Sequence, residues 1–176
     1  DIVKLLIISH GVDINSIDEF GQSPLANAIL SKNINTIIFL LDAGANPNFI
    51  DRYGDNTLMI AAYNNNLDAT RLLINHIKKL LSAAFEQEVV CRTSYLNLLP
   101  TDLRELTLRY LQNNLYKFVN RVNYKGNTAL IFATANQNAE MVKLLLANGA
   151  DVSIKNKDRK TALNVAKEKG NQETRN

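Results

Sequence analysis

The chain has 176 residues, of which 46% are apolar and 21% charged, with a formal net charge of +3 and one cysteine. This composition is typical of a globular domain and excludes an intrachain disulfide, and the mild charge permits an acidic partner without requiring nucleic acid. No apolar run approaches the roughly 20 residues that span a bilayer. Lys4 interrupts the apolar opening run and no small-residue cleavage site follows closely, so no signal peptide is predicted.

Four segments of the chain share one outline. They read DEFGQSPL from Asp18, DRYGDNTL from Asp51, NYKGNTAL from Asn123 and NKDRKTAL from Asn156. The first two starts are 33 residues apart, as are the last two, whereas the second and third are 72 residues apart. The chain therefore repeats one structural unit, and one copy carries an insertion of 39 residues.

Each unit carries the signals of a first helix followed by a turn. A residue type that caps helix N-termini stands sixth in the unit: Ser23, Asn56, Thr128 and Thr161. A small residue, which predicts the close approach of another element, stands eleventh: Ala28, Ala61, Ala133 and Ala166. A break that ends in Asn then predicts a tight turn between two helices, at residues 32–33, 65–66, 137–138 and 170–171.

A second apolar stretch follows the turn, as in IIFLLDAGANPN from Ile37 and MVKLLLANGADV from Met141. Gly44 and Gly149 stand at the ends of these stretches, and we expect both to be left-handed helix C-caps. The last unit ends in GNQETRN and has no apolar second stretch, as a polar terminal unit would. One unit cannot bury both of its helices alone, so the units must stack.

The insertion predicts two long helices. The second helix of the unit at Asp51 continues through LLINHIKKLLSAAFEQEVV, and another helix, capped by Thr101 or Asp102, runs through PTDLRELTLRYLQNNLYKFV. We expect the two helices to pack on each other or on the stacked units. The alternative is that some apolar residues stay exposed as a docking patch: Phe85, Val89, Val90, Leu96, Leu98 and Leu99.

The 33-residue unit, its Asp-x-x-Gly-x-Thr-x-Leu opening, the alanine at its eleventh position and the run VKLLLANGADV resemble the ankyrin repeat. The resemblance covers about residues 1–76 and 118–176 and implies an all-α solenoid of stacked helix–turn–helix units joined by hairpin-like turns. It divides a single domain, 1–176, into a half repeat (1–17), repeats at 18–50, 51–122 and 123–155, and a short terminal repeat (156–176), with the helical insertion at about 77–117. Arg159 replaces the turn glycine, which predicts strain if its backbone is left-handed.

The sequence carries few signals of catalysis. His10 and His76 are expected near the ends of second helices, where histidine commonly contacts carbonyl groups, and the alternative is a thiolate pair of His76 with Cys91. Metal-ligand spacings and phosphate-binding loops are not found. We therefore predict no enzyme, no cofactor and no metal.

Basic residues gather near the C-terminus without interleaved aromatic residues, so nucleic acid is not an expected partner: Lys155, Lys157, Arg159, Lys160, Lys167, Lys169 and Arg175.

The resemblance implies a non-catalytic protein-interaction module, because partners of ankyrin stacks usually lie on the concave side, against hairpin tips and first helices. The matching tip residues here are Glu19, Phe20, Gln22, Arg52, Tyr53, Asp55, Tyr124, Lys125 and Asn127. The first-helix ends add Tyr63, Asn64 and Asn136. Aromatic and arginine side chains at such tips are typical of interface hot spots.

We expect a monomer that binds a protein partner. The Asn-, Ile- and Lys-rich repeats resemble those of ankyrin proteins from intracellular bacteria and large DNA viruses, which implies a chain that is cytoplasmic or delivered into a host cell, with a host factor as partner. The chain starts inside an element, so the alternative is the recognition segment of a larger enzyme or effector whose active domain lies outside these residues.

Overall fold

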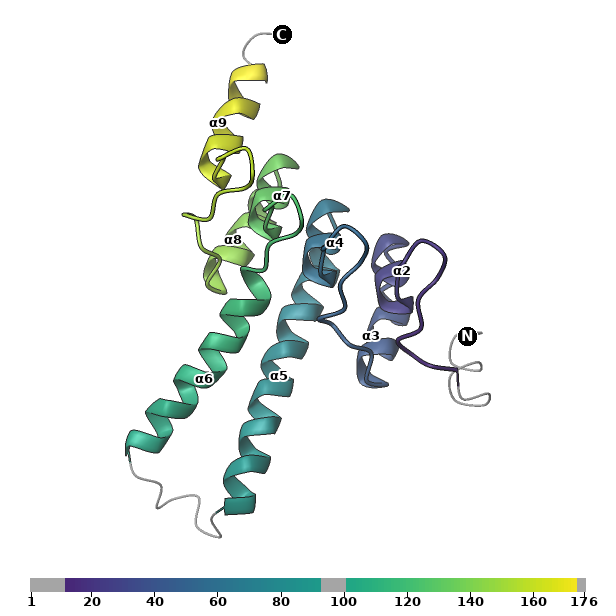
Figure 1. Ribbon diagram of the computed structural model, residues 1–176, viewed down its shortest axis with the longest axis vertical. Coiled ribbons are helices and arrows are strands. Elements are labelled where there is room, and N and C mark those ends of the chain that lie inside the picture. Colours follow the sequence, from purple (N-terminus) through teal and green to yellow (C-terminus); the bar gives the residue numbers. More distant parts are fainter. Residues whose placement is uncertain (1–11, 93–100, 174–176) are drawn as a thin grey trace.

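The computed structural model describes residues 12–92 and 101–173, except for the side chains at 84–92, 101–108, 111 and 171–173. Three helix pairs follow one another along this part of the chain. They are α2 (Pro24–Leu30) with α3 (Ile34–Asp42), α4 (Thr57–Tyr63) with α5 (Leu67–Arg92), and α7 (Ala129–Ala135) with α8 (Ala139–Ala147). Helix α6 (Thr101–Val119) lies between the second and third pairs, and α9 (Ala162–Glu173) ends the row (Figure 1).

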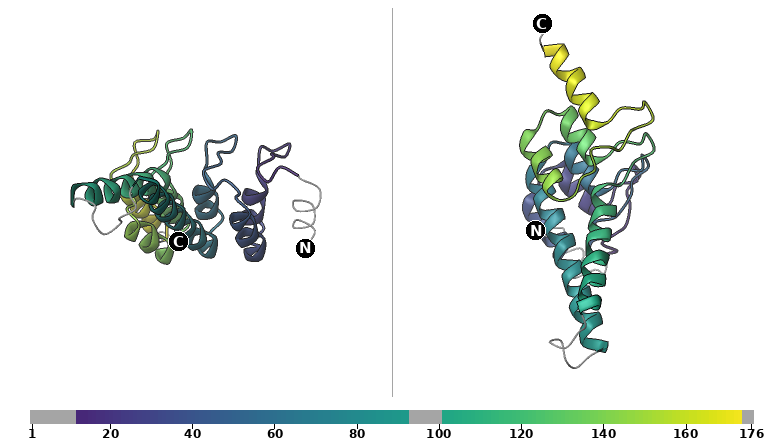
Figure 2. Two further views of the ribbon diagram at one scale, coloured as in Figure 1. Left: turned by 90° about the horizontal axis from the view of Figure 1, so that it is seen from below. Right: turned by 90° about the vertical axis from the view of Figure 1, so that its left-hand side faces the viewer.

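The pairs stack in register. The first helices pack in the order α2, α4, α7 and α9, and the second helices in the order α3, α5 and α8. The loops before the first helices project side by side from the same side of the row (Figure 2). The predicted all-α ankyrin solenoid is therefore confirmed.

Polar side chains start the helices where the sequence predicts. Ser23, Asn56 and Thr128 accept hydrogen bonds from the backbone N–H of the third residue that follows each, at 3.2, 3.0 and 3.2 Å. Each second helix begins in the same way, after Asn33, Asn66 or Asn138. The turn residue before each of these caps has a positive φ, as expected: Lys32 (55°), Asn65 (52°) and Gln137 (56°). Gly44 and Gly149 also have the expected left-handed backbone conformation, with φ angles of 91° and 84°.

The predicted break at 170–171 is wrong, because α9 runs without interruption to Glu173. In the complete pairs the backbone N–H of the second helix's Asn cap donates to the carbonyl of the buried alanine, as Asn33 does to Ala28 at 3.0 Å. Ala166 is exposed and no second helix follows among the described residues, so nothing holds a turn there. Thr161 caps α9 reciprocally with Asn164: each side-chain oxygen accepts from the other's backbone N–H.

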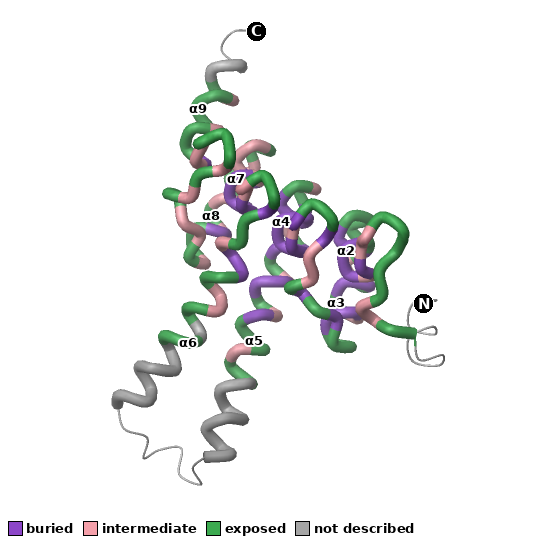
Figure 3. Tube along the Cα trace, in the orientation of Figure 1, coloured by how far each residue is buried: buried purple, intermediate pink, exposed green. Residues whose placement is uncertain are grey.

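The core lies between the first and second helices of the three pairs, whereas α9 is mostly exposed (Figure 3). Equivalent leucines of the first helices, Leu25, Leu58 and Leu130, are buried, and so are three of the four predicted alanines, Ala28, Ala61 and Ala133. The expectation of close packing fails at the fourth, Ala166. The reason is that no second helix follows α9 among the residues that the structure describes.

The insertion forms a two-helix arm. Helices α5 and α6 contact each other and leave the stack together (Figures 1 and 2), so the predicted continuation of the second helix and its packing against a second long helix are confirmed. Phe118 and Val119 at the base are buried, and Asn56 Nδ2 donates to the Phe118 carbonyl oxygen at 3.0 Å. Because α4 packs directly on α7, the stack is continuous across the insertion.

Some expectations about the insertion fall on undescribed residues. Helix α6 starts at Thr101, but the capping roles of Thr101 and Asp102 rest on side chains outside the described set. The same is true of the six residues of the predicted docking patch, and most of the half repeat expected at 1–17 lies outside the described residues.

Candidate protein-binding face

Four hairpins before the first helices are closed by the same hydrogen bonds. In the first, Asp18 N–H donates to the Gln22 carbonyl at 3.0 Å and Gly21 N–H to the Asp18 carbonyl at 2.9 Å. The Asp18 carboxylate also accepts from the backbone N–H groups of Phe20 and Gln22. Asp51, Asn123 and Asn156 organise the other hairpins identically. The hydrogen bond from the Asn27 side chain is the largest influence that lowers the pKa of Asp18.

Side chains at the hairpin bases tie each repeat to the next. Gln22 Nε2 donates to Asp51 Oδ2 at 3.2 Å, Asn123 Nδ2 to Asp55 Oδ1 at 2.8 Å, and Asn156 Nδ2 to Asn127 Oδ1 at 3.0 Å. Three predicted binding residues, Gln22, Asp55 and Asn127, are therefore half-buried and take part in contacts between repeats. Burial raises the pKa of Asp55, although the hydrogen bond from Asn123 opposes that rise.

Neighbouring hairpins also bond through the backbone, with one exception. Tyr124 N–H donates to the Tyr53 carbonyl at 3.1 Å, and Lys157 N–H donates to the Lys125 carbonyl at 2.9 Å. Between the first two hairpins the Arg52 side chain takes this role: Nε donates to the Phe20 carbonyl at 2.5 Å and Nη2 to the Glu19 carbonyl at 2.6 Å.

The hairpin tips and the ends of the first helices expose aromatic rings. Phe20, Tyr53 and Tyr124 at successive tips are 60%, 61% and 66% exposed, and Tyr63 at the end of α4 is 68% exposed. Glu19, Arg52 and Lys125 place exposed charges beside these rings. We call this surface, from the tips to the C-terminal ends of α2, α4 and α7, the finger face.

One aromatic contact on the finger face was missed by sequence reasoning. The ring of Phe132 in α7 meets Tyr63 edge-on, with centroids 5.5 Å apart and planes at 80°. Phe132 holds the tenth place of its unit, where the other units have Asn27, Ile60 and Val165. The aromatic residue at this place in one unit alone was the sequence feature that could have indicated the contact.

Two predicted binding residues hold the stack together. Asn64 Nδ2 donates to the Leu30 carbonyl at 2.8 Å and to the Ile29 carbonyl at 3.2 Å. Asn136 Nδ2 donates in the same way to the carbonyls of Ala62 and Tyr63, both at 2.9 Å. These carbonyls belong to the last turn of the preceding first helix and would otherwise lack partners. The amide groups thus link successive first helices.

The histidine expectations need correction. His76 lies inside α5, away from a helix end, and burial lowers its pKa. Cys91 is fifteen residues further along the same helix, about 22 Å away by helix geometry, so the two cannot form a thiolate pair. His10 lies outside the described residues. Among the described residues, no three His, Cys, Asp or Glu side chains gather as metal ligands do.

Two further observations concern membrane and nucleic-acid contacts. Within the described ranges, none of the helices combines the length and apolar character that crossing a bilayer requires. In the basic C-terminal region, Lys160 is bonded to Glu168 at 2.7 Å, and this contact raises the pKa of Lys160. Lys155, Lys157 and Arg159 are exposed.

The stacked helix pairs and their hairpins define a repeat protein, and comparison with known proteins identifies its kind. Family models described as ankyrin repeats match residues 1–83 and 115–166. Ankyrin repeat protein YahD of Escherichia coli (strain K12) is 30% identical, over 94% of this chain and 83% of that protein. The chain therefore belongs to the ankyrin-repeat family.

Two similar viral proteins are longer. Ankyrin repeat protein L271 of Acanthamoeba polyphaga mimivirus is 28% identical, and the match covers 94% of this chain and 20% of the viral protein. Ankyrin repeat protein FPV240 of fowlpox virus (strain NVSL) is 32% identical, over 77% of this chain and 32% of that protein. The chain thus spans a fifth to a third of these relatives. Ankyrin repeats are generally non-catalytic modules of protein interaction.

Proposed function

We propose that the chain binds a protein partner through the finger face, without catalysis. The observation that carries this proposal is the row of exposed rings at Phe20, Tyr53 and Tyr124 on hairpins with a hydrogen-bonded backbone. Aromatic side chains dominate interface energetics, and a rigid backbone reduces the entropy lost on binding. Tyr63 extends the row to the helix ends.

Within the predicted binding set, the contacts suggest two roles. Seven residues present their side chains to a partner: Glu19, Phe20, Arg52, Tyr53, Tyr63, Tyr124 and Lys125. The other five residues set the spacing of the repeats through their hydrogen bonds and so hold the finger face in position: Gln22, Asp55, Asn64, Asn127 and Asn136. Arg52 serves both roles, because its guanidinium also lies 5.9 Å from the centre of the Phe20 ring.

The partner we propose is a protein in a host cell, bound by a monomer of this chain. Similarity to proteins of two viruses supports the host as a source. Nucleic acid is a weaker candidate, because the exposed cations of the last hairpin, Lys157 and Arg159, have no aromatic residue beside them in the sequence for base stacking.

Affinity capture with matched variants tests this proposal. The wild-type chain, a Phe20→Ala/Tyr53→Ala/Tyr124→Ala variant and an Ile38→Ala/Leu80→Ala/Tyr110→Ala control are immobilised and exposed to host-cell lysate. The control removes exposed apolar side chains from α3, α5 and α6, away from the finger face. We expect a protein that mass spectrometry finds with wild type and control but not with the first variant. Equal retention by all three would contradict the proposal.

A further inference from the structure

The exposed charges of the hairpin tips change sign along the row of hairpins, which project side by side (Figure 2). The first hairpin presents two carboxylates, Asp18 and Glu19, and has no basic residue. The third presents the ammonium group of Lys125 and has no acidic residue. The fourth presents two cations against one carboxylate: Lys157, Arg159 and Asp158. The row is thus acidic at its first hairpin and basic at its third and fourth.

The second hairpin lies where the sign changes. Its exposed Arg52 is offset by the carboxylate of Asp55, which is half-buried. Asp51 is buried and its carboxylate is bonded within the hairpin, so this group does not face a partner. In the fourth hairpin, Lys160 pairs with Glu168 at 2.7 Å and therefore adds little to the basic end.

Three of the charged tip groups are not engaged within the chain. Among the residues that the structure describes, no hydrogen bond or ion pair uses the Glu19 carboxylate or the ammonium groups of Lys125 and Lys157. Lys125 acts electrostatically on Asp55, but that carboxylate is held by Asn123 Nδ2 at 2.8 Å. A partner can therefore meet these three charges without breaking a contact of the chain.

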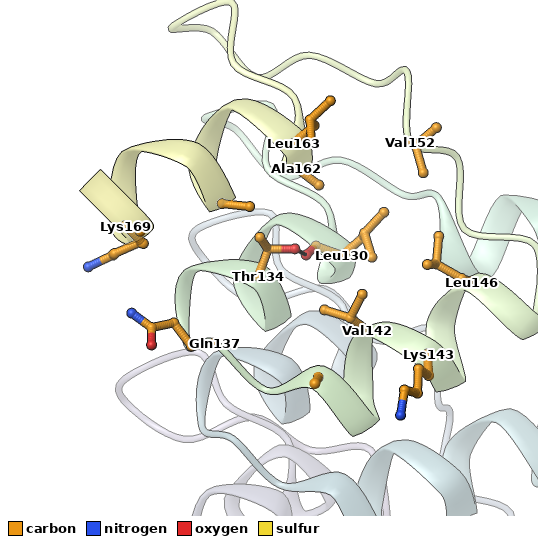
Figure 4. Close-up of a pocket in the computed structure, with 13 residues that line it drawn as sticks. Leu130, Thr134, Gln137, Val142, Lys143, Leu146, Val152, Ala162, Leu163 and Lys169 are labelled. Atoms are coloured by element: carbon orange, nitrogen blue, oxygen red, sulfur yellow. Dashed lines mark hydrogen bonds between the residues drawn. The ribbon is translucent and has the colours of Figure 1, made fainter. Parts of the chain in front are cut away.

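Tip side chains stay exposed even where hairpins flank them on both sides. Tyr53 and Tyr124 belong to such inner hairpins and are mostly exposed. The fourth hairpin continues the same row, because α9 packs on α7, and Figure 4 shows Ala162 of α9 and Leu130 of α7 around one hollow. The exposure of the charges therefore follows from their place at the tips and not from the place of a hairpin in the row.

The spacing of the repeats sets the length of a segment that would meet both ends of the row. Packed helices lie about 8–10 Å apart, so the first and fourth hairpins are separated by roughly 25–30 Å. An extended chain covers that distance with about eight residues, at about 3.3 Å each. Lys32, a basic residue of the first repeat, follows the far end of α2 and lies roughly 10 Å off this line.

We propose that the finger face binds an extended protein segment of opposite polarity. Its basic residues lie over Glu19, its apolar or aromatic residues over the tip rings, and its acidic residues over Lys125 and Lys157. This inference rests on the proposed function and adds the chemistry of the partner. The rings supply most of the affinity, and the charges decide which way the segment lies along the row.

Selection from a phage-displayed library of random peptides of about twelve residues, longer than the span of the row, tests the inference. The library is selected on the immobilised wild-type chain, and fluorescence anisotropy then measures the affinity of the enriched peptides. The variants are Glu19→Lys and Lys125→Glu/Lys157→Glu. The control Lys78→Glu/Lys117→Glu makes the same change of charge at exposed positions of the α5–α6 arm.

We expect enriched peptides with basic residues near one end, acidic residues near the other and apolar or aromatic residues between them. Glu19→Lys and Lys125→Glu/Lys157→Glu should each bind these peptides at least about threefold more weakly than wild type, and the arm control should bind them as wild type does. Replacing the basic residues of a peptide with Glu should restore its binding to Glu19→Lys and weaken its binding to wild type. Circular dichroism confirms that the variants are folded.

Peptides without separated charges, or peptides that the arm control weakens as much as the tip variants do, would overturn the inference. A selection that enriches no peptide would also overturn it, while capture from lysate would still test the proposed function. Peptides that lose binding to Phe20→Ala/Tyr53→Ala/Tyr124→Ala but are indifferent to charge reversal would overturn the inference alone. Equal binding to that triple variant would contradict the proposed function as well.

Discussion

Arg52 joins the first two hairpins by binding the backbone of Phe20. Its Nε donates to the Phe20 carbonyl at 2.5 Å while the guanidinium lies 5.9 Å from the centre of the Phe20 ring. At the later junctions a backbone N–H makes the equivalent bond, from Tyr124 or Lys157. At the first junction an exposed side chain thus makes the bond between the hairpin tips, while the Gln22–Asp51 hydrogen bond joins the hairpin bases.

Replacement of Arg52 should weaken the stack at this junction. We expect Arg52→Ala to reduce the free energy of unfolding by about 1 kcal/mol, since it removes two hydrogen bonds to exposed carbonyls. Arg52→Lys keeps the charge but not the planar fork, so it should restore less than half of the loss. Urea denaturation of the three chains measures both effects. Stability unchanged in Arg52→Ala would show that the hairpins do not rely on this side chain.

Gly54 lies against the next hairpin, and this contact predicts a large cost for a side chain. Its φ is +81°, and a Cβ built on it would lie 2.9 Å from the Tyr124 backbone nitrogen. Gly44 has a φ of +91°, but nothing lies within 4 Å of its added Cβ. We expect Gly44→Ala to cost about 1 kcal/mol through backbone strain alone, and Gly54→Ala to cost about 3 kcal/mol. Thermal unfolding measures both losses of stability. Equal losses in Gly44→Ala and Gly54→Ala would mean that the hairpins separate easily.

Asp55 should make stability depend on pH. Burial raises the pKa of its carboxyl, so its contribution to stability is fully present below the unfolded pKa and is lost as the pH rises through the folded pKa. Asp55→Asn keeps an acceptor oxygen for Asn123, as Asn127 does for Asn156. We expect this variant to gain about 0.5 kcal/mol at neutral pH, a small value because the group is half exposed.

That gain should shrink as the pH falls through the folded pKa of Asp55, where the wild-type carboxyl becomes neutral as well. Urea denaturation of both chains across a pH series follows the difference in unfolding free energy. An advantage of Asp55→Asn that stayed constant into the acid range would contradict the raised pKa.

Arg159 adopts the strained backbone that the missing turn glycine predicts, with a φ of 60°. Arg159→Gly removes about 1 kcal/mol of strain but gives the unfolded chain more freedom, so the net gain should be about 0.5 kcal/mol. The matched control is Lys157→Gly in the same hairpin. The φ angle of Lys157 is not positive, so glycine there relieves no strain and should only destabilise the fold. A thermal unfolding experiment in which Lys157→Gly is more stable than Arg159→Gly would contradict this interpretation.

Local chemistry made most of the fold predictable. The N-cap side chains bond to a backbone N–H only three residues further on, as at Ser23, Asn56 and Thr128. The left-handed glycines that follow second helices, Gly44 and Gly149, likewise depend only on the adjacent helix end. Short sequence patterns therefore contain the necessary information. The turn at 170–171 was mispredicted because such a turn also needs a second helix to pack on Ala166. A short pattern cannot reveal whether that packing exists.

The candidate binding face was harder to divide into roles. Tip position alone placed Phe20, Tyr53 and Tyr124 on the surface correctly. The role of Asn64 and Asn136 was missed, because the carbonyls that they bind lie 34 and 74 residues earlier in the chain. A polar residue at a helix end has the same appearance in sequence whether it contacts solvent or the neighbouring repeat.

Photo-crosslinking is the most direct test of the finger face. p-Benzoylphenylalanine replaces Tyr53, Tyr124 or, as a control of similar exposure on α6, Tyr110, and the chain is irradiated with the captured partner. We predict covalent adducts from positions 53 and 124 and none from position 110. Adducts from position 110 with none from the hairpin tips would contradict the account and move the binding surface to the α5–α6 arm.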